Sequence, residues 1–199
     1  MNTRIRHFLA FLILLLTASL CQATPFHAAL SGPAEATPNA SPGTGMVTGN
    51  FDPVAHTLSI NVTFSGLLAP TTAAHIHCCS VVPGAGTAGV ATQTPTFSGF
   101  PLGAMAGNYN AVFDTSLPAS WNGAFLTANG GGTAGAEQAF NAGLLAGQAY
   151  FNIHSMQFPS GEIRGFLQPV PEPANIALWG GGLLVLIGAL RRRAGAARA

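Results

Sequence analysis

The sequence predicts an all-β fold, an antiparallel β-sandwich or barrel with long loops rich in glycine and proline. The clearest observation is the segment 58–64, which alternates apolar and polar residues without exception, as a strand with one buried face does. Other short apolar segments recur along the chain between turn residues, and no strand–helix–strand rhythm connects them. Together these features indicate antiparallel strands packed around one core.

Six further segments have the length and composition of strands. Asp52-Pro53 is a turn signal between two of them, and Pro159-Ser160-Gly161 is another, because proline and glycine interrupt regular structure. The six strand candidates are residues 26–30, 45–51, 73–77, 109–113, 149–154 and 162–167.

One short helix is predicted over residues 135–146. Phe140 and Leu144 recur there at helical spacing, although Gly143 lowers the helix propensity of the segment. Residues 83–107 are rich in glycine, proline and threonine and are predicted to form a long loop.

The N-terminus has the features of an export signal. A basic start and the uncharged apolar run 8–20 precede a small-x-small cleavage site, so residues 1–23 form a predicted signal peptide that is cut between Ala23 and Thr24. Lipoprotein processing at Cys21 is the alternative, but the bulky leucine before that cysteine fits a lipobox poorly. We therefore favour ordinary signal cleavage.

The C-terminus combines an extended proline-bounded tripeptide, a short apolar run and a basic stop. The run of 17 residues would span about 26 Å as a helix, slightly less than a ~30 Å hydrocarbon core. Because arginines stay in the cytoplasm, both ends predict that the residues between them are translocated. The three parts are Pro171, Glu172 and Pro173, then the predicted transmembrane helix 174–190, then Arg191, Arg192 and Arg193.

This tail, residues 170–199, resembles the PEP-CTERM sorting signal of Gram-negative bacteria that make exopolysaccharide. The resemblance implies recognition by an exosortase-type membrane protease and cleavage near the Pro-Glu-Pro tripeptide. It also implies a precursor tethered to the inner membrane. The processed protein would then reach the periplasm, the outer surface or the extracellular matrix.

Charge in the exported part of the chain is sparse. Between Thr24 and Val170 the one basic side chain is Arg164, against five acids, which gives a net charge of −4 with neutral histidines. Nucleic acid requires several basic contacts to phosphate, so the composition excludes a nucleic-acid-binding domain.

Two cysteines remain after signal cleavage, Cys78 and Cys79, and they are neighbours in the sequence. Adjacent Cα atoms lie ~3.8 Å apart, closer than the ~4.4–6.8 Å usual for a disulfide. A vicinal bridge, metal ligation, pairing between molecules and two plain thiols therefore remain as alternatives. In each case the fold is not held together by a framework of disulfides.

Three sequence blocks recur together between the two ends. They are residues 26–32 with Glu35, residues 64–67 with 73–77, and residues 149–155 with 158–165. In this order they resemble the CHRD domain, first named from chordin, and we assign residues 24–169 to it. The resemblance implies a β-rich extracellular module, with an immunoglobulin-like or superoxide-dismutase-like sandwich as the expected form, and it implies no established chemistry. The cysteine pair departs from the family pattern, in which a glycine commonly follows the second histidine.

Three histidines in these blocks form a candidate metal site. On a strand, His75 and His77 point to one face, and His154 would join them if the two strands are neighbours. Such a set suits zinc or copper, with Cys79 or Glu162 as an extra ligand. Copper/zinc superoxide dismutase also uses a His-x-His strand, but this is analogy at the level of the fold.

A structural role is the alternative for the same residues. Buried histidines in small β domains often bond a loop carbonyl or a carboxylate, and no cofactor is then expected. Glu162 and Arg164 share a face of their strand and are predicted to form a buried ion pair. We expect no catalytic residues, since the chain has no nucleophile elbow, no paired acids and no phosphate-binding loop in a strand-to-helix context.

The function expected from the sequence is that of an exported envelope or biofilm-matrix protein with a structural or binding role. In that role, loops such as 83–107 and 130–135 would contact exopolysaccharide or other matrix proteins. The alternative is a zinc- or copper-binding β-sandwich protein with redox activity.

Overall fold

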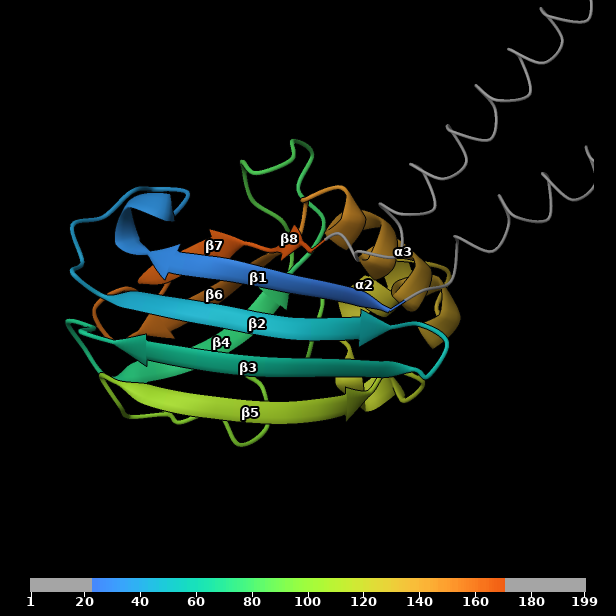
Figure 1. The fold of residues 1–199 in the computed structure, drawn as a ribbon, viewed down its shortest axis with the longest axis horizontal. Coiled ribbons are helices and arrows are strands. Elements are labelled where there is room, and N and C mark those ends of the chain that lie inside the picture. Colours follow the sequence, from blue (N-terminus) through green and yellow to red (C-terminus); the bar gives the residue numbers. More distant parts are fainter. Residues whose placement is uncertain (1–22, 171–199) are drawn as a thin grey trace, which may run out of the picture. The chain divides into compact units, whose positions relative to one another are not determined.

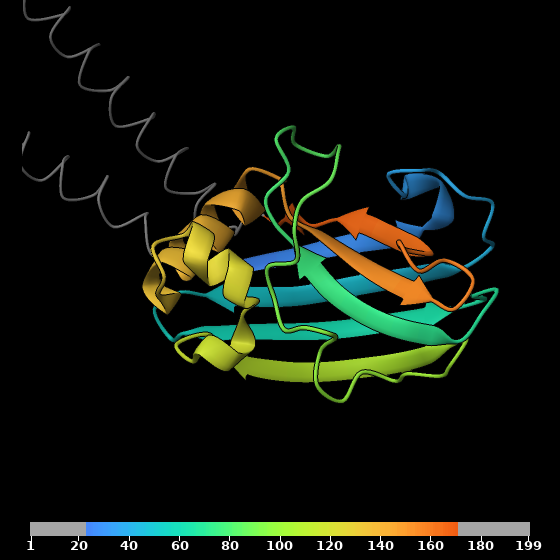
Figure 2. The same cartoon turned by 180° about the vertical axis from the view of Figure 1, so that it is seen from behind.

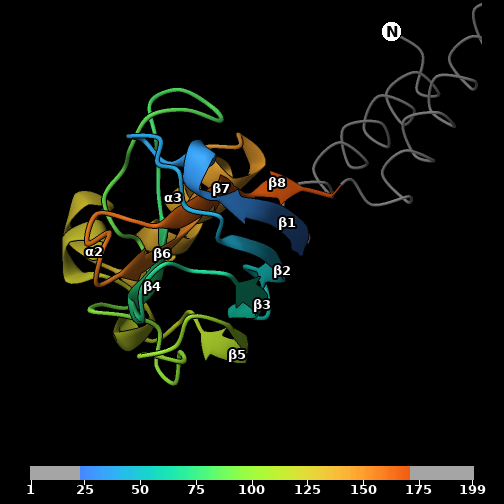
Figure 3. The same cartoon turned by 90° about the vertical axis from the view of Figure 1, so that its left-hand side faces the viewer.

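The computed structural model describes residues 23–170, in which eight strands form one antiparallel sheet (Figure 1). The sheet is strongly curled into a half-barrel, as the view along the strands shows (Figure 3). The domain is mostly β and antiparallel, as predicted, with two short helices. The sequence left a sandwich or a barrel open, and the structure shows one curled sheet. The strands are β1 (Thr24–Ser31), β2 (Thr44–Asp52), β3 (Thr57–Ser65), β4 (Thr71–His77), β5 (Gly107–Asp114), β6 (Tyr150–Ser155), β7 (Ile163–Phe166) and β8 (Gln168–Pro169).

Every strand that the sequence predicts is present, with ends that differ by no more than two residues. The strand order is β4-β6-β7-β1-β2-β3-β5, and the two-residue β8 pairs with β1. This order places β4 beside β6, although the two strands are about half the domain apart in sequence. In their register Ala73 lies opposite His154 and His75 lies opposite Asn152.

Two helices lie together at one end of the sheet (Figure 2). They are α2 (Gly123–Ala128) and α3 (Thr133–Leu145). The chain also forms two 3-10 turns, η3 (Pro118–Ser120) and, at the opposite end of the sheet, η2 (Gly32–Ala34). The predicted helix is α3, whose Phe140 packs edge-on against Phe51 of β2, with ring centroids 5.1 Å apart. Helix α2 was not predicted, because its six residues are too few for a periodic pattern. The Asn122 side chain caps it by accepting the Ala124 N–H.

The hydrophobic core lies on the inner face of the curled sheet and is completed by the long β4–β5 connection. That connection runs beside the free edge of β4, where the Phe97 N–H donates to the Ala74 carbonyl. Its Phe97 side chain stacks on Phe113 and Phe151, with ring centroids 5.2 and 5.8 Å apart. The core is therefore complete within residues 24–169, and this segment is expected to fold by itself.

Both predicted targeting segments fall almost wholly outside the described residues, since these begin at residue 23 and end at residue 170. Thr24, the predicted first residue of the mature chain, is the first residue of β1. Within residues 23–170 there is no helix of the length and apolar character needed to span a membrane.

Candidate metal centre

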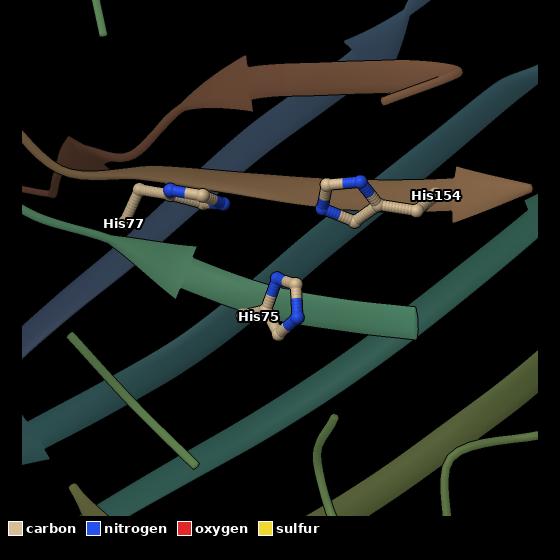
Figure 4. Close-up of side chains that lie close together, drawn as sticks. All are labelled: His75, His77 and His154. Carbon is tan, nitrogen blue, oxygen red and sulfur yellow. The ribbon is translucent and has the colours of Figure 1, made fainter. Parts of the chain in front are cut away.

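The three candidate histidines lie together on the face of β4 and β6 that points away from the core (Figure 4). Their neighbours Ala74, Ile76, Phe151 and Ile153 point to the opposite face and are fully buried in the core. One ring nitrogen from each histidine lies within 4.8 Å of the other two. The strand parity that the sequence predicts and the pairing of β4 with β6 together produce this convergence.

Each imidazole is held by one hydrogen bond to a backbone carbonyl. His75 Nε2 lies 2.8 Å from the Pro95 oxygen, His77 Nδ1 lies 2.9 Å from the Ala88 oxygen, and His154 Nδ1 lies 2.9 Å from the Pro159 oxygen. A carbonyl oxygen only accepts, so each of these nitrogens carries the ring proton. The other nitrogen of each neutral ring is left with a free lone pair.

Those remaining nitrogens are Nδ1 of His75, Nε2 of His77 and Nε2 of His154. All three are buried, and none has a hydrogen-bond partner within the described part of the chain. A buried acceptor without a partner costs on the order of 1–3 kcal/mol. Three such acceptors that face one another would destabilise the fold more than a purely structural cluster is expected to. A metal ion would satisfy all three at once, and the carbonyl bonds are the outer-sphere support that ligating histidines usually have.

Burial also keeps the three rings neutral. Desolvation lowers the pKa of His75 to about 4, with the nearby His154 as a second cause. Desolvation likewise lowers the pKa of His77 to about 4 and moves the pKa of His154 below its usual value. Neutral imidazole is the form that binds a metal, so at neutral pH the cluster is ready for an ion without losing protons.

A stacked row of side chains continues from the cluster across the sheet. The His77 ring lies parallel to the Tyr150 ring at 4.7 Å between centroids, and the Arg164 guanidinium carbon lies 4.8 Å from the Tyr150 centroid. Arg164 is buried and donates to the carbonyls of Ala34 and Gly86, at 2.6 and 3.0 Å. This arginine thus ties two loops to the outer face of the sheet.

The acid that pairs with Arg164 is Glu35, not Glu162 as the sequence suggested. Arg164 Nε lies 3.9 Å from Glu35 Oε2, and both side chains are buried. Desolvation raises the pKa of Glu35 to about 7, although the positive charge of Arg164 offsets part of that effect. Sequence reasoning missed Glu35 as a partner because it sits in a loop more than a hundred residues from Arg164.

Glu162 has a different role from both of those predicted for it. Its Oε1 accepts the Ser41 hydroxyl and the Leu68 N–H, each at 2.6 Å, and the side chain is fully buried. Glu162 lies just before β7, and its partners are in loops. The alternation of residues along a strand does not predict such contacts. It is not part of the histidine group, so the extra-ligand prediction for Glu162 is not supported.

Cys78 and Cys79 form a vicinal disulfide, one of the alternatives that the sequence left open. The pair packs against Gly143 of α3, where an added Cβ would lie 2.5 Å from Cys78 Sγ and closer still to Cys79 Sγ. The disulfide therefore packs directly on the helix. Cys79 is not a member of the histidine group. The glycine that weakens α3 as a helix makes room for this disulfide.

The sequence blocks that carry the candidate site also carry the relationship to known proteins. The CHRD domain family matches residues 26–167, well over half of the chain. The chain belongs to the CHRD domain family. In this CHRD domain the first block forms β1, the second spans the end of β3 and β4, and the third forms β6 and β7. No curated protein and no solved structure matches the chain.

The other histidines of the described CHRD domain lie away from the cluster. His27 is exposed on β1. His56 Nδ1 lies 3.0 Å from Glu137 of α3, and this carboxylate raises the pKa of His56. Glu137 is buried and also accepts the Thr115 hydroxyl, so the group fastens α3 to the loops at the end of the sheet. The sequence does not predict this group, because His56, Thr115 and Glu137 come from three different segments of the chain.

Proposed function

We propose that this CHRD domain is an exported metal-binding module that holds one zinc or copper ion through His75, His77 and His154. The observation that carries the proposal is the set of three buried ring nitrogens without partners, each turned toward the same space. Imidazole suits zinc and copper well, while magnesium and calcium prefer oxygen ligands.

The geometry needs a modest adjustment to hold an ion. Zn–N bonds of ~2.0–2.1 Å place tetrahedral ligand nitrogens about 3.4 Å apart, and here the nitrogens lie within 4.8 Å. Rotation of rings on paired strands can close such a gap while each ring keeps its carbonyl partner. The donor set would then combine Nδ1 of His75 with Nε2 of His77 and of His154.

We also propose where this module acts. The N-terminal 23 residues and the tail from residue 170 support export through the inner membrane, recognition by an exosortase-type protease, and delivery to the cell surface or matrix. Cleavage before Thr24 would leave all of β1 intact, and cleavage near Pro171 would leave the whole sheet intact.

A structural or binding role without metal is the second candidate function. Exposed side chains such as Val81, 92% exposed, support contact of the 83–107 region and its flank with matrix polysaccharide or protein. Two carbonyls of that loop, those of Ala88 and Pro95, are however bonded to the histidines. We therefore rank metal binding first.

The proposal is tested by metal titration of the segment 24–170, purified without a histidine tag and stripped with a chelator. We expect about one copper or zinc ion per chain. The double variant His75→Ala, His77→Ala should lose at least about 100-fold in affinity, because first-sphere ligands matter more than outer-sphere ones, which already contribute ~10–100-fold. His27→Ala removes an exposed histidine outside the cluster and should leave the affinity unchanged.

Equal metal binding by the double variant and by His27→Ala would contradict the proposal, since the ion would then sit elsewhere. Absence of stoichiometric zinc or copper in the unaltered protein would contradict it as well. The structural alternative would be favoured if the double variant only lowered the unfolding temperature.

A further inference from the structure

Among the described residues, no side chain gives the candidate metal centre a negative charge. Its three histidines are neutral, and no carboxylate or thiolate of the described residues joins the group. Two buried carboxylates of the described residues bind other partners, Glu35 beside Arg164 and Glu162 with loop donors. A divalent ion would therefore bring its full charge into a largely buried site, where an uncompensated charge is costly.

The neighbouring charge has the wrong sign to help. Arg164 lies beyond Tyr150 in the stacked row, with its guanidinium carbon 4.8 Å from the Tyr150 centroid and the Tyr150 ring 4.7 Å from the His77 ring. A cation at the histidines would thus be repelled weakly by Arg164 instead of being neutralised. The electrostatic environment favours a negative ligand on the ion.

The ion would also be short of ligands. Three protein ligands are typical of zinc sites that keep an open position, whereas structural zinc sites are closed by four. Cys79 is consumed by its disulfide and packs on α3, and Glu162 binds Ser41 and Leu68. His75 is buried, while His77 and His154 are half-buried as residues, so the cluster lies near the surface of the domain although its three facing nitrogens are buried.

We propose that the ion held by His75, His77 and His154 keeps one coordination position open for a small anion from solution, such as hydroxide. This inference rests on the proposed metal site and adds the chemical class of its external ligand. A monoanion would supply the fourth ligand and offset half of the charge of a divalent ion. With a metal-bound hydroxide the centre would have the reactive unit used by open three-histidine sites.

The test uses azide as the probe and the copper(II)-loaded segment 24–170, in chloride-free buffer at pH 7. Azide should produce a charge-transfer absorption band and a changed electron paramagnetic resonance spectrum, both saturating at one azide per copper. A protein that holds copper stoichiometrically but shows unchanged spectra in saturating azide would overturn the inference and leave the metal site itself standing. A protein that holds no copper would instead overturn the proposed function.

A matched pair of variants tests the charge argument. Ala73 lies on the same face as His75 and directly opposite His154 in the register of β4 and β6. A carboxylate there would supply the missing negative charge, so Ala73→Glu should weaken azide binding at least about 10-fold relative to the uncharged Ala73→Gln. Equal azide affinity of the two copper-loaded variants would show that charge does not select the ligand.

Discussion

At the scale of single residues, position 143 requires glycine because a disulfide packs against it. Alanine is the better helix former by ~1 kcal/mol, so Gly143→Ala would stabilise an isolated helix. In this fold the new Cβ would collide with the Cys78–Cys79 disulfide, and overpacking of this kind costs ~1–3 kcal/mol. We expect a net loss of about 1 kcal/mol in the free energy of unfolding by urea.

Gly123→Ala at the start of α2 is the control for that variant, because an added Cβ there meets no atom within 4 Å. It should be neutral within ~0.5 kcal/mol or slightly stabilising. If Gly143→Ala were as stable as this control, the helix would not be seated on the disulfide as described.

Glu35 makes the stability of the protein depend on pH in a direction that can be stated. Burial raises its pKa to about 7 from 4.5, so the folded state holds a proton that the unfolded state has lost between these values. The contribution is fully present below pH 4.5 and is lost as the pH rises to about 7. The loss amounts to at most about 3 kcal/mol.

Comparison with Glu35→Gln isolates this effect, because glutamine cannot ionise. The histidines, whose pKa values are lowered, shift stability the opposite way in both proteins, since they destabilise the fold as the pH falls below 6.5. Denaturant unfolding from pH 4.5 to 8 should show the unaltered protein losing stability relative to the variant as the pH rises. A constant difference across this range would contradict the raised pKa.

The alternation of residues along a strand predicts some residues of the site and not others. Alternation places His75 and His77 on one face and His154 on the matching face of its own strand. It does not encode which strands are neighbours, nor the carbonyls of Ala88 and Pro95, which reach the rings from a loop. The choice of ring nitrogen therefore comes from the structure alone.

At the scale of elements, Glu162 joins β7 to two loops. Its carboxylate accepts the Ser41 hydroxyl and the Leu68 N–H, and hydrogen bonds to a charged acceptor contribute ~1.5–3 kcal/mol each. Glu162→Ala leaves the buried Ser41 hydroxyl and the part-buried Leu68 N–H without this acceptor and should cost about 2–4 kcal/mol. Thermal and urea unfolding measure this loss.

Glu162→Gln is the matched variant, since its amide oxygen still accepts from both donors. It should lose no more than about half as much stability as Glu162→Ala. If the two variants were equally stable, the two loop contacts would not be what Glu162 provides.

The elements that the sequence predicts well are those with a strong local pattern. Strand β3 alternates strictly, and all six other predicted strands are found within two residues of their expected ends. Strand β8 has two residues and α2 has six, so neither is long enough to show a period. Their positions depend on contacts with β1 and α3, which are tertiary information.

At the scale of the whole molecule, we propose that an exported domain lies between two targeting ends. The prolines of the Pro-Glu-Pro tripeptide favour an extended chain that a protease can bind. We expect Pro171→Ala, Pro173→Ala to accumulate as a larger, uncleaved form in the membrane fraction, as immunoblots of fractionated cells would show. Met156→Ala, at an exposed position of the domain, should be processed normally. Normal processing of the double proline variant would contradict the sorting proposal.

The order of the strands in the sheet explains why distant blocks of the chain meet at one site. Strands β4 and β6 are adjacent only because the order β4-β6-β7-β1 returns the C-terminal strands to the edge of the sheet. A local pattern cannot reveal such a return, so the sequence predicted the histidine faces but made their convergence conditional on this pairing.

The most direct test of the metal centre is a crystal structure of the copper- or zinc-loaded segment 24–170, with anomalous scattering recorded at the metal edge. We predict one strong anomalous peak about 2.0–2.1 Å from Nδ1 of His75, Nε2 of His77 and Nε2 of His154. A peak at His27 or His56, or no peak among the three rings at full metal loading, would contradict the account.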